Sequence, residues 1–392
     1  MNRVYMDHAA ATPVRRRVLD AMLPYFDREF GNPSTVYDMG SKVKQVVEGQ
    51  REKVAELIGA KPGEIIFTSS GAEANNLAIK GVAFARQKKG NHIVISSIEH
   101  HSVLNSARFL ERMGFEVTFL AVDKYGLVEP GRLMEAIRPE TILVSIMHAN
   151  NEIGTIEPIS ELSSVCREKG VVFHTDGVAT VGNIPVKVDK LGVDLLSLSG
   201  VSLGAPKGIG ALYFRDRIRL MPLIHGGIQE RGRRAGTENV PAIVGLGKAS
   251  ELAAEELANG VNGSRVREMR NTLVSGVRER IEHSKHTGHP EKRLPGHASF
   301  CFEAIEGEAL LFMLSQGGVY ANTGSACASK ALKTSPVLAA IGIPPEVAQG
   351  SIVFTMNGSN RIEEVEYVLE KLPPAVERLR SFSPIWKKSM AA

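Results

Sequence analysis

Short runs of β-branched and other apolar residues alternate with helical periodicity along the first two thirds of the chain. Seven of these runs have the length and composition of buried strands: EIIFTSS, HIVISS, EVTFLAV, TILVSIMHAN, VVFHTDG, DLLSLSG and GALYF. The alternation predicts an α/β fold, in which a mainly parallel seven-stranded sheet between about residues 18 and 257 is covered by helices on both faces. Ligands of such sheets bind outside the carboxyl ends of the strands.

A second, smaller unit follows the sheet. The stretch NGVNGS interrupts the pattern at residues 259–264, and a helical pattern then runs from residue 265 to about 281. Further on, HASFCFEAI predicts a strand, and both EALLFMLSQGG and IEEVEYVLEKLPPAVERLR predict helices. We therefore expect two domains, a large α/β domain of residues 15–262 and a small α+β domain formed by residues 1–14 and 263–392.

Composition narrows the class of protein. The 47 basic and 43 acidic residues leave a formal charge of +4, which disfavours nucleic acid or a membrane surface as a partner. The chain lacks an apolar run of about 18 residues and an N-terminal secretory signal, so we expect a soluble, cytoplasmic protein. Three cysteines are too few for a disulfide framework and would be free thiols: Cys166, Cys301 and Cys327.

Several motifs are spread over the chain in a fixed order: YMDHAAATPV, GNPSTVYDMG, SIEHHSV, MHANNEIGTI, HTDGVATVG, PKGIGALY, HGGIQERGRRAGTENV, TGSACAS and SFSPIW. In order and spacing they resemble the cysteine desulfurases that serve iron–sulfur cluster assembly. The resemblance implies the class V aminotransferase family, the type I fold of pyridoxal-phosphate-dependent transferases, and a homodimer with pyridoxal phosphate at its interface. In that family the sulfur of cysteine passes to a loop cysteine as a persulfide, and alanine is left.

The lysine that holds the cofactor in that family has no counterpart here. The family pattern is Ser-Gly-His-Lys, whereas this chain has Ser199-Gly200-Val201-Ser202. A serine hydroxyl cannot form an imine with the cofactor, and it is a far weaker base than an amine. Lys207 matches a second family lysine and is not a substitute. We therefore predict that no cofactor is bound covalently.

Other positions of the resembling pocket differ as well. Ala72 stands where the family has a phosphate-binding threonine, and Val201 replaces a histidine that also contacts the phosphate. Ala179 replaces a glutamine that bonds the cofactor's phenolic oxygen, and Val353 replaces the arginine that clamps the substrate carboxylate. Charge-assisted hydrogen bonds contribute about 1.5 to 3 kcal/mol each, so losing two phosphate donors weakens binding by roughly 10² to 10⁴. These differences predict a degenerate cofactor site.

Some residues of the resembling pocket are retained. His100 matches the histidine that stacks on the cofactor ring, and Asp176 matches the aspartate that pairs with the pyridine nitrogen. Ser199 is also present, and Thr237 matches a threonine that reaches the partner subunit's phosphate. A structural interpretation stands beside each of these roles, because strand-end aspartates often cap helices and strand-end histidines often bond backbone groups.

Cys327 is the candidate reactive residue. It lies in NTGSACASK, whose small residues leave a thiol uncrowded. The resemblance makes it the sulfur acceptor, and a thiolate there could also be a transient ligand of an iron–sulfur cluster shared with a scaffold protein. The alternative is a small apolar residue packed in a loop. We expect no role for Cys166 or Cys301, and we expect a solvated loop rather than a metal site for three further residues: His283, His286 and His289.

Three functions are compatible with the sequence. The first is a cysteine desulfurase homologue that cannot use pyridoxal phosphate covalently and acts as the dimeric partner of the scaffold, with Cys327 as persulfide carrier or transient cluster ligand. The alternative is an active desulfurase that holds the cofactor non-covalently and converts L-cysteine to L-alanine plus enzyme persulfide. The further alternative is a purely structural docking partner, in which Cys327 is dispensable.

Overall fold

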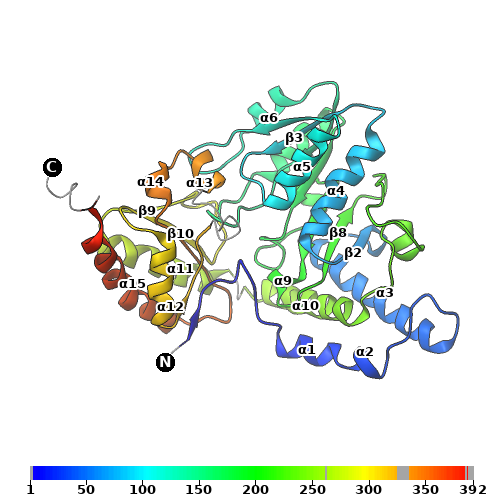
Figure 1. The fold of residues 1–392 in the computed structure, drawn as a ribbon. Helices are drawn as coiled ribbons and strands as arrows, with labels where there is room; N and C mark the ends of the chain where they lie inside the picture. The colour runs from blue at the N-terminus through cyan, green and yellow to red at the C-terminus, as the bar shows by residue number, and fades with distance from the viewer. Residues whose placement is uncertain (1–2, 261–262, 325–334, 385, 387–392) are drawn as a thin grey trace.

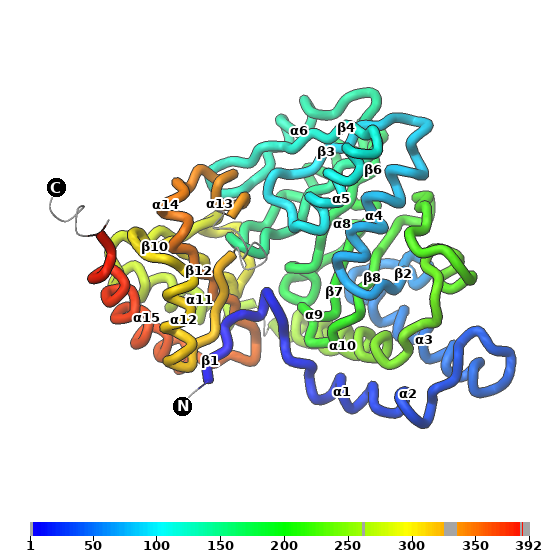
Figure 2. Tube along the Cα trace, viewed as in Figure 1, coloured from blue at the N-terminus to red at the C-terminus, as the bar shows by residue number. Residues whose placement is uncertain are grey.

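The computed structural model describes residues 3–260, 263–324, 335–384 and 386. The chain forms two lobes, and the N-terminal strand β1 (Val4–Tyr5) lies on the smaller one although α1 (Arg16–Met22) lies on the larger (Figure 1). The tube in Figure 2 shows the segment between them crossing from one lobe to the other. Distant parts of the sequence therefore meet where the lobes face each other.

The main sheet of the larger lobe has seven strands, as the apolar runs predict. Their order is β2 (Ile65–Thr68), β8 (Gly210–Phe214), β7 (Leu195–Ser199), β6 (Val172–Asp176), β5 (Thr141–Ser145), β3 (His92–Ser96) and β4 (Glu116–Leu120). Strand β8 is antiparallel to β2 and β7, and the other pairs are parallel. The predicted mainly parallel α/β sheet is confirmed.

Helices cover both faces of this sheet because its central strands are apolar on both sides. In β3, Ile93 and Ile95 pack with the helices of one face, and Val94 packs with those of the other. The first face carries α4 (Gly71–Arg86) and α5 (His101–Arg112). The second face carries α1, α3 (Asp38–Ile58), α6 (Pro130–Ala136), α7 (Ile159–Glu168), α8 (Val188–Leu191), α9 (Gly200–Leu203) and α10 (Val240–Ala258).

Short elements complete the larger lobe. Helix α2 (Pro24–Asp27) follows α1, and two 3-10 turns are formed by η1 (Pro62–Glu64) and η2 (Gln229–Gly232).

The smaller lobe has its own apolar cluster. Its antiparallel sheet has the order β12 (Ser351–Thr355), β10 (His297–Phe302) and β9 (Ser284–His286), and β1 pairs in parallel with β11 (Val319–Tyr320). The helices are α11 (Ser264–Arg280), α12 (Gly307–Gln316), α13 (Pro336–Ala340), α14 (Pro345–Ala348) and α15 (Ile362–Phe382). Val4 and Met6 are buried in this cluster. The exact domain boundaries stay a prediction.

The end of α15 is fixed against the smaller lobe. The guanidinium of Arg380 lies 4.2 Å from the centroid of the Trp386 ring and donates hydrogen bonds to backbone carbonyls of Glu282, His283 and Glu303. None of the described helices is long and apolar enough to cross a membrane.

Candidate functional site

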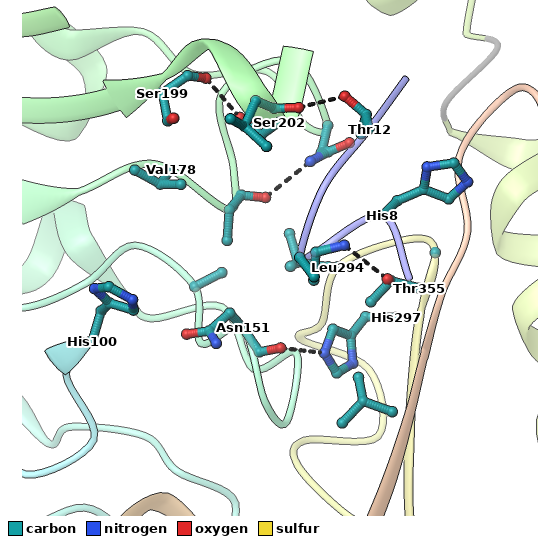
Figure 3. Close-up of a pocket in the computed structure, with 18 of the residues that line it drawn as sticks. His8, Thr12, His100, Asn151, Val178, Ser199, Ser202, Leu294, His297 and Thr355 are labelled. Atoms are coloured by element: carbon teal, nitrogen blue, oxygen red, sulfur yellow. Dashed lines mark hydrogen bonds between the residues drawn. The ribbon is translucent and has the colours of Figure 1, made fainter. Parts of the chain in front are cut away.

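A cavity of about 500 Å³ lies between the lobes, at the carboxyl ends of the central strands (Figure 3). The larger lobe contributes Asp176 at the end of β6 and Ser199 at the end of β7. The smaller lobe contributes His297 and Val353 from its sheet, and His8 comes from the N-terminal segment. The cavity is therefore where the parallel strand pattern predicts a ligand site.

All five positions at which the sequence departs from the resembling pocket line this one cavity: Ala72, Ala179, Val201, Ser202 and Val353. They come from α4, from the loop after β6, from α9 and from β12, and so from distant parts of the chain. Among the described residues that line the cavity, Asp176 is the only carboxylate, and there is no lysine or arginine. This lining therefore supplies no primary amine.

The retained residues divide into two groups. His100, Asp176 and Ser199 line the cavity. Thr237 is exposed and does not line it, and neither does the exposed Lys207. Cys327, the predicted sulfur carrier and cluster ligand, lies outside the described residues.

Ser202 lies in a tight turn that the local sequence explains. Strand β7 ends at Ser199, a single helical turn follows, and Gly204 ends that turn with φ of +76°. A Cβ on Gly200 would lie 2.6 Å from the side chain of Ile209, so only glycine fits there. The Ser202 hydroxyl donates to the carbonyl oxygen of Ser199 at 2.9 Å. Its proton is thus bonded to the backbone and does not point to a base.

The floor of the cavity is a chain of hydrogen bonds. Asp176 accepts from the Asn75 side-chain amide at 2.6 Å and from the backbone N–H of Val178 at 2.9 Å. The same Asn75 amide donates to the Ser102 hydroxyl at 2.9 Å, and that hydroxyl lies 2.7 Å from Nδ1 of His100. Burial raises the pKa of Asp176. The chain therefore couples His100 to the buried carboxyl group.

The imidazoles of the opposite wall carry no charge near neutral pH. Burial lowers the pKa of His297 to about 3, and its Nε2 lies 2.9 Å from the carbonyl oxygen of Asn151. Burial also lowers the pKa of His8. An anionic ligand would therefore find no cationic partner in these two side chains.

Comparison with known proteins places this arrangement in a family. The family model described as Aminotransferase class-V matches residues 4–368. The chain belongs to the class V aminotransferases. It is 51% identical to the cysteine desulfurase IscS of Methanosarcina thermophila over 98% of this chain and 95% of that protein. It is also 51% identical to the cysteine desulfurase IscS of Dictyoglomus turgidum, with 98% of both chains covered.

Solved structures agree with this class V assignment. A NifS-like protein has a TM-score of 0.90 and 38% identity, covering 96% of this chain and all of that one. The apo structure of a cysteine desulfurase from Thermococcus onnurineus NA1 has a TM-score of 0.86 and 26% identity, covering 96% of this chain and 95% of that one. The predicted type I transferase fold is confirmed.

The fold implies pyridoxal phosphate, and the described cavity residues can be compared with that cofactor. Asp176 and His100 suit a protonated ring nitrogen and an aromatic face, and Ser70 caps the N-terminus of α4 at the cavity edge. Covalent attachment requires an amine, and a phosphate or carboxylate is best held by cationic side chains. The described lining has neither, so these residues do not fit a covalently attached cofactor.

The other sequence candidates lie away from the cavity of this class V chain. Cys166 and Cys301 are buried, and burial raises the pKa of Cys301 to about 12 and that of Cys166 further. A thiol with such a pKa is unreactive at neutral pH.

The three histidines of the predicted solvated loop do not all lie in a loop. His286 belongs to β9, and burial beside Arg293 lowers its pKa to about 2. That part of the prediction is wrong, because pairing with β10 turns a polar stretch into an edge strand. His283 lies 3.3 Å from Glu303, and Nδ1 of His289 accepts backbone N–H groups. The described residues contain no group of three side chains placed to hold a metal ion.

Two residues of the cavity floor escape prediction from the sequence. Asn75 is 1% exposed on the face of α4 that packs on the sheet, and Ser102 lies in the first turn of α5. A polar residue among the apolar positions Ala74 and Ala78 is a weak signal of a buried hydrogen-bond network. Its partners, however, become visible only in the fold.

Proposed function

We propose that this chain is a cysteine desulfurase homologue that acts in sulfur transfer for iron–sulfur cluster assembly without attaching pyridoxal phosphate covalently. The observation that carries the proposal is the cavity lining, in which the described residues provide no amine and Ser202 stands where the resemblance expects the lysine. The Ser202 hydroxyl bonds the backbone, which supports the same conclusion. The apolar side chains of Val201 and Val353 remove further polar contacts.

Cys327 is the proposed carrier. Its thiolate would attack the terminal sulfur of a donor persulfide, so that a new S–S bond forms on Cys327 while the donor leaves as a thiolate. This exchange needs no oxidant and no residue of the cavity. The same thiolate suits a transient ligand role, because soft thiolates bind iron–sulfur clusters.

A second candidate is an active, pyridoxal-phosphate-dependent cysteine desulfurase that holds its cofactor non-covalently. The relatives that are 51% identical over nearly the whole chain carry the name cysteine desulfurase, and their names favour this candidate over the first. The retained His100, Asp176 and Ser199 also support it. The missing amine and the uncharged His8 and His297 favour the first candidate instead.

We also propose a homodimer. Large apolar side chains are exposed along the N-terminal helices, in the loop before α3 and near η2, the most exposed being Val36 in that loop at 98% and Ile228 at 89%. Exposed apolar patches of this kind are typical of protein interfaces. For the scaffold protein we propose the end of α15, where Phe382 is 72% exposed.

Two measurements separate the candidates. The purified protein is mixed with pyridoxal phosphate and L-cysteine, and alanine is quantified; the first candidate predicts no alanine, and robust turnover would establish the second. Cluster assembly on the cognate scaffold is then compared between wild type and Cys327→Ser. Loss of assembly supports the carrier role, whereas unchanged assembly leaves the purely structural docking partner.

A further inference from the structure

The carboxyl group on the floor of the cavity has unused capacity to accept hydrogen bonds. Asp176 is 4% exposed, and its oxygens accept one bond each, from the Asn75 amide at 2.6 Å and from the backbone N–H of Val178 at 2.9 Å. A carboxylate can accept about four hydrogen bonds, so about two more can be made to Asp176. Both present donors are uncharged, so neither of them neutralises the buried carboxylate.

A second acceptor lies beside this carboxyl group. The amide nitrogen of Asn75 donates to Asp176 and also to the Ser102 hydroxyl at 2.9 Å, which uses both of its hydrogens. The amide oxygen of Asn75 is buried and has no hydrogen-bond partner among the described residues. A buried acceptor without a donor is unfavourable. The floor of the cavity therefore favours a ligand that presents N–H groups.

Another buried acid lies close to Asp176. Glu99 is 3% exposed, and burial raises its pKa well above the usual range, with the charge of Asp176 acting in the same direction. One oxygen of Glu99 accepts the Ser96 hydroxyl at 2.6 Å and the backbone N–H of Met147 at 2.8 Å, and both of these donors are uncharged. A positive charge on a ligand at Asp176 would be attracted by these acids, and a negative charge would be repelled.

The walls of the cavity contribute no charged donor in the part of the chain that the structure describes. Lysine and arginine are absent from that lining, and burial lowers the pKa of both His8 and His297. Arg270 and Arg293 lie near His297 but do not line the cavity, and their guanidinium groups donate to backbone carbonyl oxygens. A phosphate or carboxylate group would therefore lose its hydration here without gaining a charged donor from the described lining.

The remaining walls are uncharged. Apolar side chains come from both lobes, Val178 from the larger one and Leu294 from the smaller one (Figure 3). Hydroxyl and amide groups lie among them, including Ser199, Ser202 and Asn151. The volume of about 500 Å³ is typical of cavities that hold small organic molecules. The cavity thus suits a ligand of one or two rings whose substituents are uncharged.

We propose that this cavity binds a small amine or nitrogen heterocycle that carries no acidic group, with the protonated nitrogen of the ligand on Asp176. The cavity discriminates against phosphates and carboxylates, and so against the phosphorylated cofactor that the fold implies. The inference rests on the proposed function in one respect, namely that the cavity holds no covalently attached pyridoxal phosphate. It goes further by assigning the charge and chemical class of the ligand.

The test compares the binding of pyridoxamine and of pyridoxamine 5′-phosphate by isothermal titration calorimetry at neutral pH. The two probes have the same ring and the same amine and differ in the phosphate, and neither has the aldehyde that forms an imine with lysine. Wild type should bind pyridoxamine at least about tenfold more tightly than the phosphate, because the phosphate must be desolvated without a charged donor.

Three variants make the test specific. Asp176→Asn should weaken pyridoxamine binding by about 10- to 100-fold, because it removes the charged acceptor. Val353→Arg places a cation in the cavity wall and should reverse the preference of the cavity. The control is Asp194→Asn, since Asp194 is also buried but precedes β7, at the other end of that strand, and does not line the cavity; this variant should bind as wild type does. Circular dichroism checks that each variant is folded.

Equal or tighter binding of the phosphate by wild type would overturn the inference and favour the non-covalent cofactor of the second candidate. Failure of both probes to bind would also overturn it, as would an unchanged pyridoxamine affinity in folded Asp176→Asn.

The proposed function fails on a different result. A pyridoxal phosphate adduct trapped with borohydride on a wild-type lysine would refute the absence of covalent attachment. The two pyridoxamine probes cannot form such an adduct, so their affinities report only the charge preference of the cavity.

Discussion

Replacing Arg51 with methionine should destabilise the protein strongly, because it breaks a buried ion pair between α3 and the η2 turn. The Arg51 guanidinium contacts both carboxylate oxygens of Glu230, at 2.7 and 2.9 Å, and the two side chains are only 6% and 4% exposed. Glu230 also accepts the backbone N–H of Phe67 at 2.9 Å. In Arg51→Met, the bond from Phe67 would be the one that remains to the buried carboxylate of Glu230. Removing one partner of such a pair costs about 3 to 5 kcal/mol.

The assay is urea unfolding followed by circular dichroism at neutral pH. A loss of that size is a large fraction of the roughly 5 to 15 kcal/mol that stabilises most proteins, so the midpoint should fall clearly. The double variant Arg51→Met, Glu230→Gln removes the unpaired charge and keeps an acceptor for Phe67, so it should recover most of the loss. A single variant that loses less than about 1 kcal/mol, or a double variant no more stable than the single, would show that the unpaired Glu230 carboxylate is not the cause of the instability.

Two further predictions concern the cavity and the core. Ser202→Lys should attach pyridoxal phosphate covalently. Adding Ala72→Thr and Val201→His to that variant should tighten cofactor binding by about 10² to 10⁴, measured by titration of the visible absorbance. Equal affinities of the single and triple variants for the cofactor would contradict the assigned phosphate positions. Glu157 is buried, and burial raises its pKa from 4.5 to about 8, so wild type should lose roughly 2 to 5 kcal/mol as pH rises between these values. Glu157→Gln should flatten that dependence in urea midpoints, and an unchanged slope would assign the effect to other groups.

The main sheet could be predicted because six of its seven strands are buried on both faces and so appear as continuous apolar runs, whereas the edge strand β4 is partly exposed. Strand β9 could not, because Ser284–His286 is polar and becomes a strand only by pairing with β10. The two-residue strands β1 and β11 are equally invisible, since a parallel pair joining residues 4 and 319 has no local signal. Local pattern therefore predicts the strands of the main sheet, whereas tertiary contact decides the short or polar strands of the smaller lobe.

The residues of the candidate site also fall into those that the sequence predicts and those that only the fold reveals. Asp176 and Ser199 end apolar runs, so their place at the cavity follows from strand direction. The positions of Ala72 and Val353 came from the family resemblance, and the fold places both at the cavity. Asn75 acts through a partner distant in sequence, Asp176, and no spacing rule connects the two.

Borohydride trapping shows directly whether pyridoxal phosphate becomes covalently attached to a lysine of this chain. The purified protein is mixed with pyridoxal phosphate, reduced with borohydride to fix any covalent link to a lysine, digested and mapped by mass spectrometry, with Ser202→Lys as the positive control. We expect a stoichiometric adduct on residue 202 of that variant and none on any lysine of the wild type. A stoichiometric adduct on a wild-type lysine, including Lys207 or the lysines at 330 and 333 outside the described residues, would contradict it.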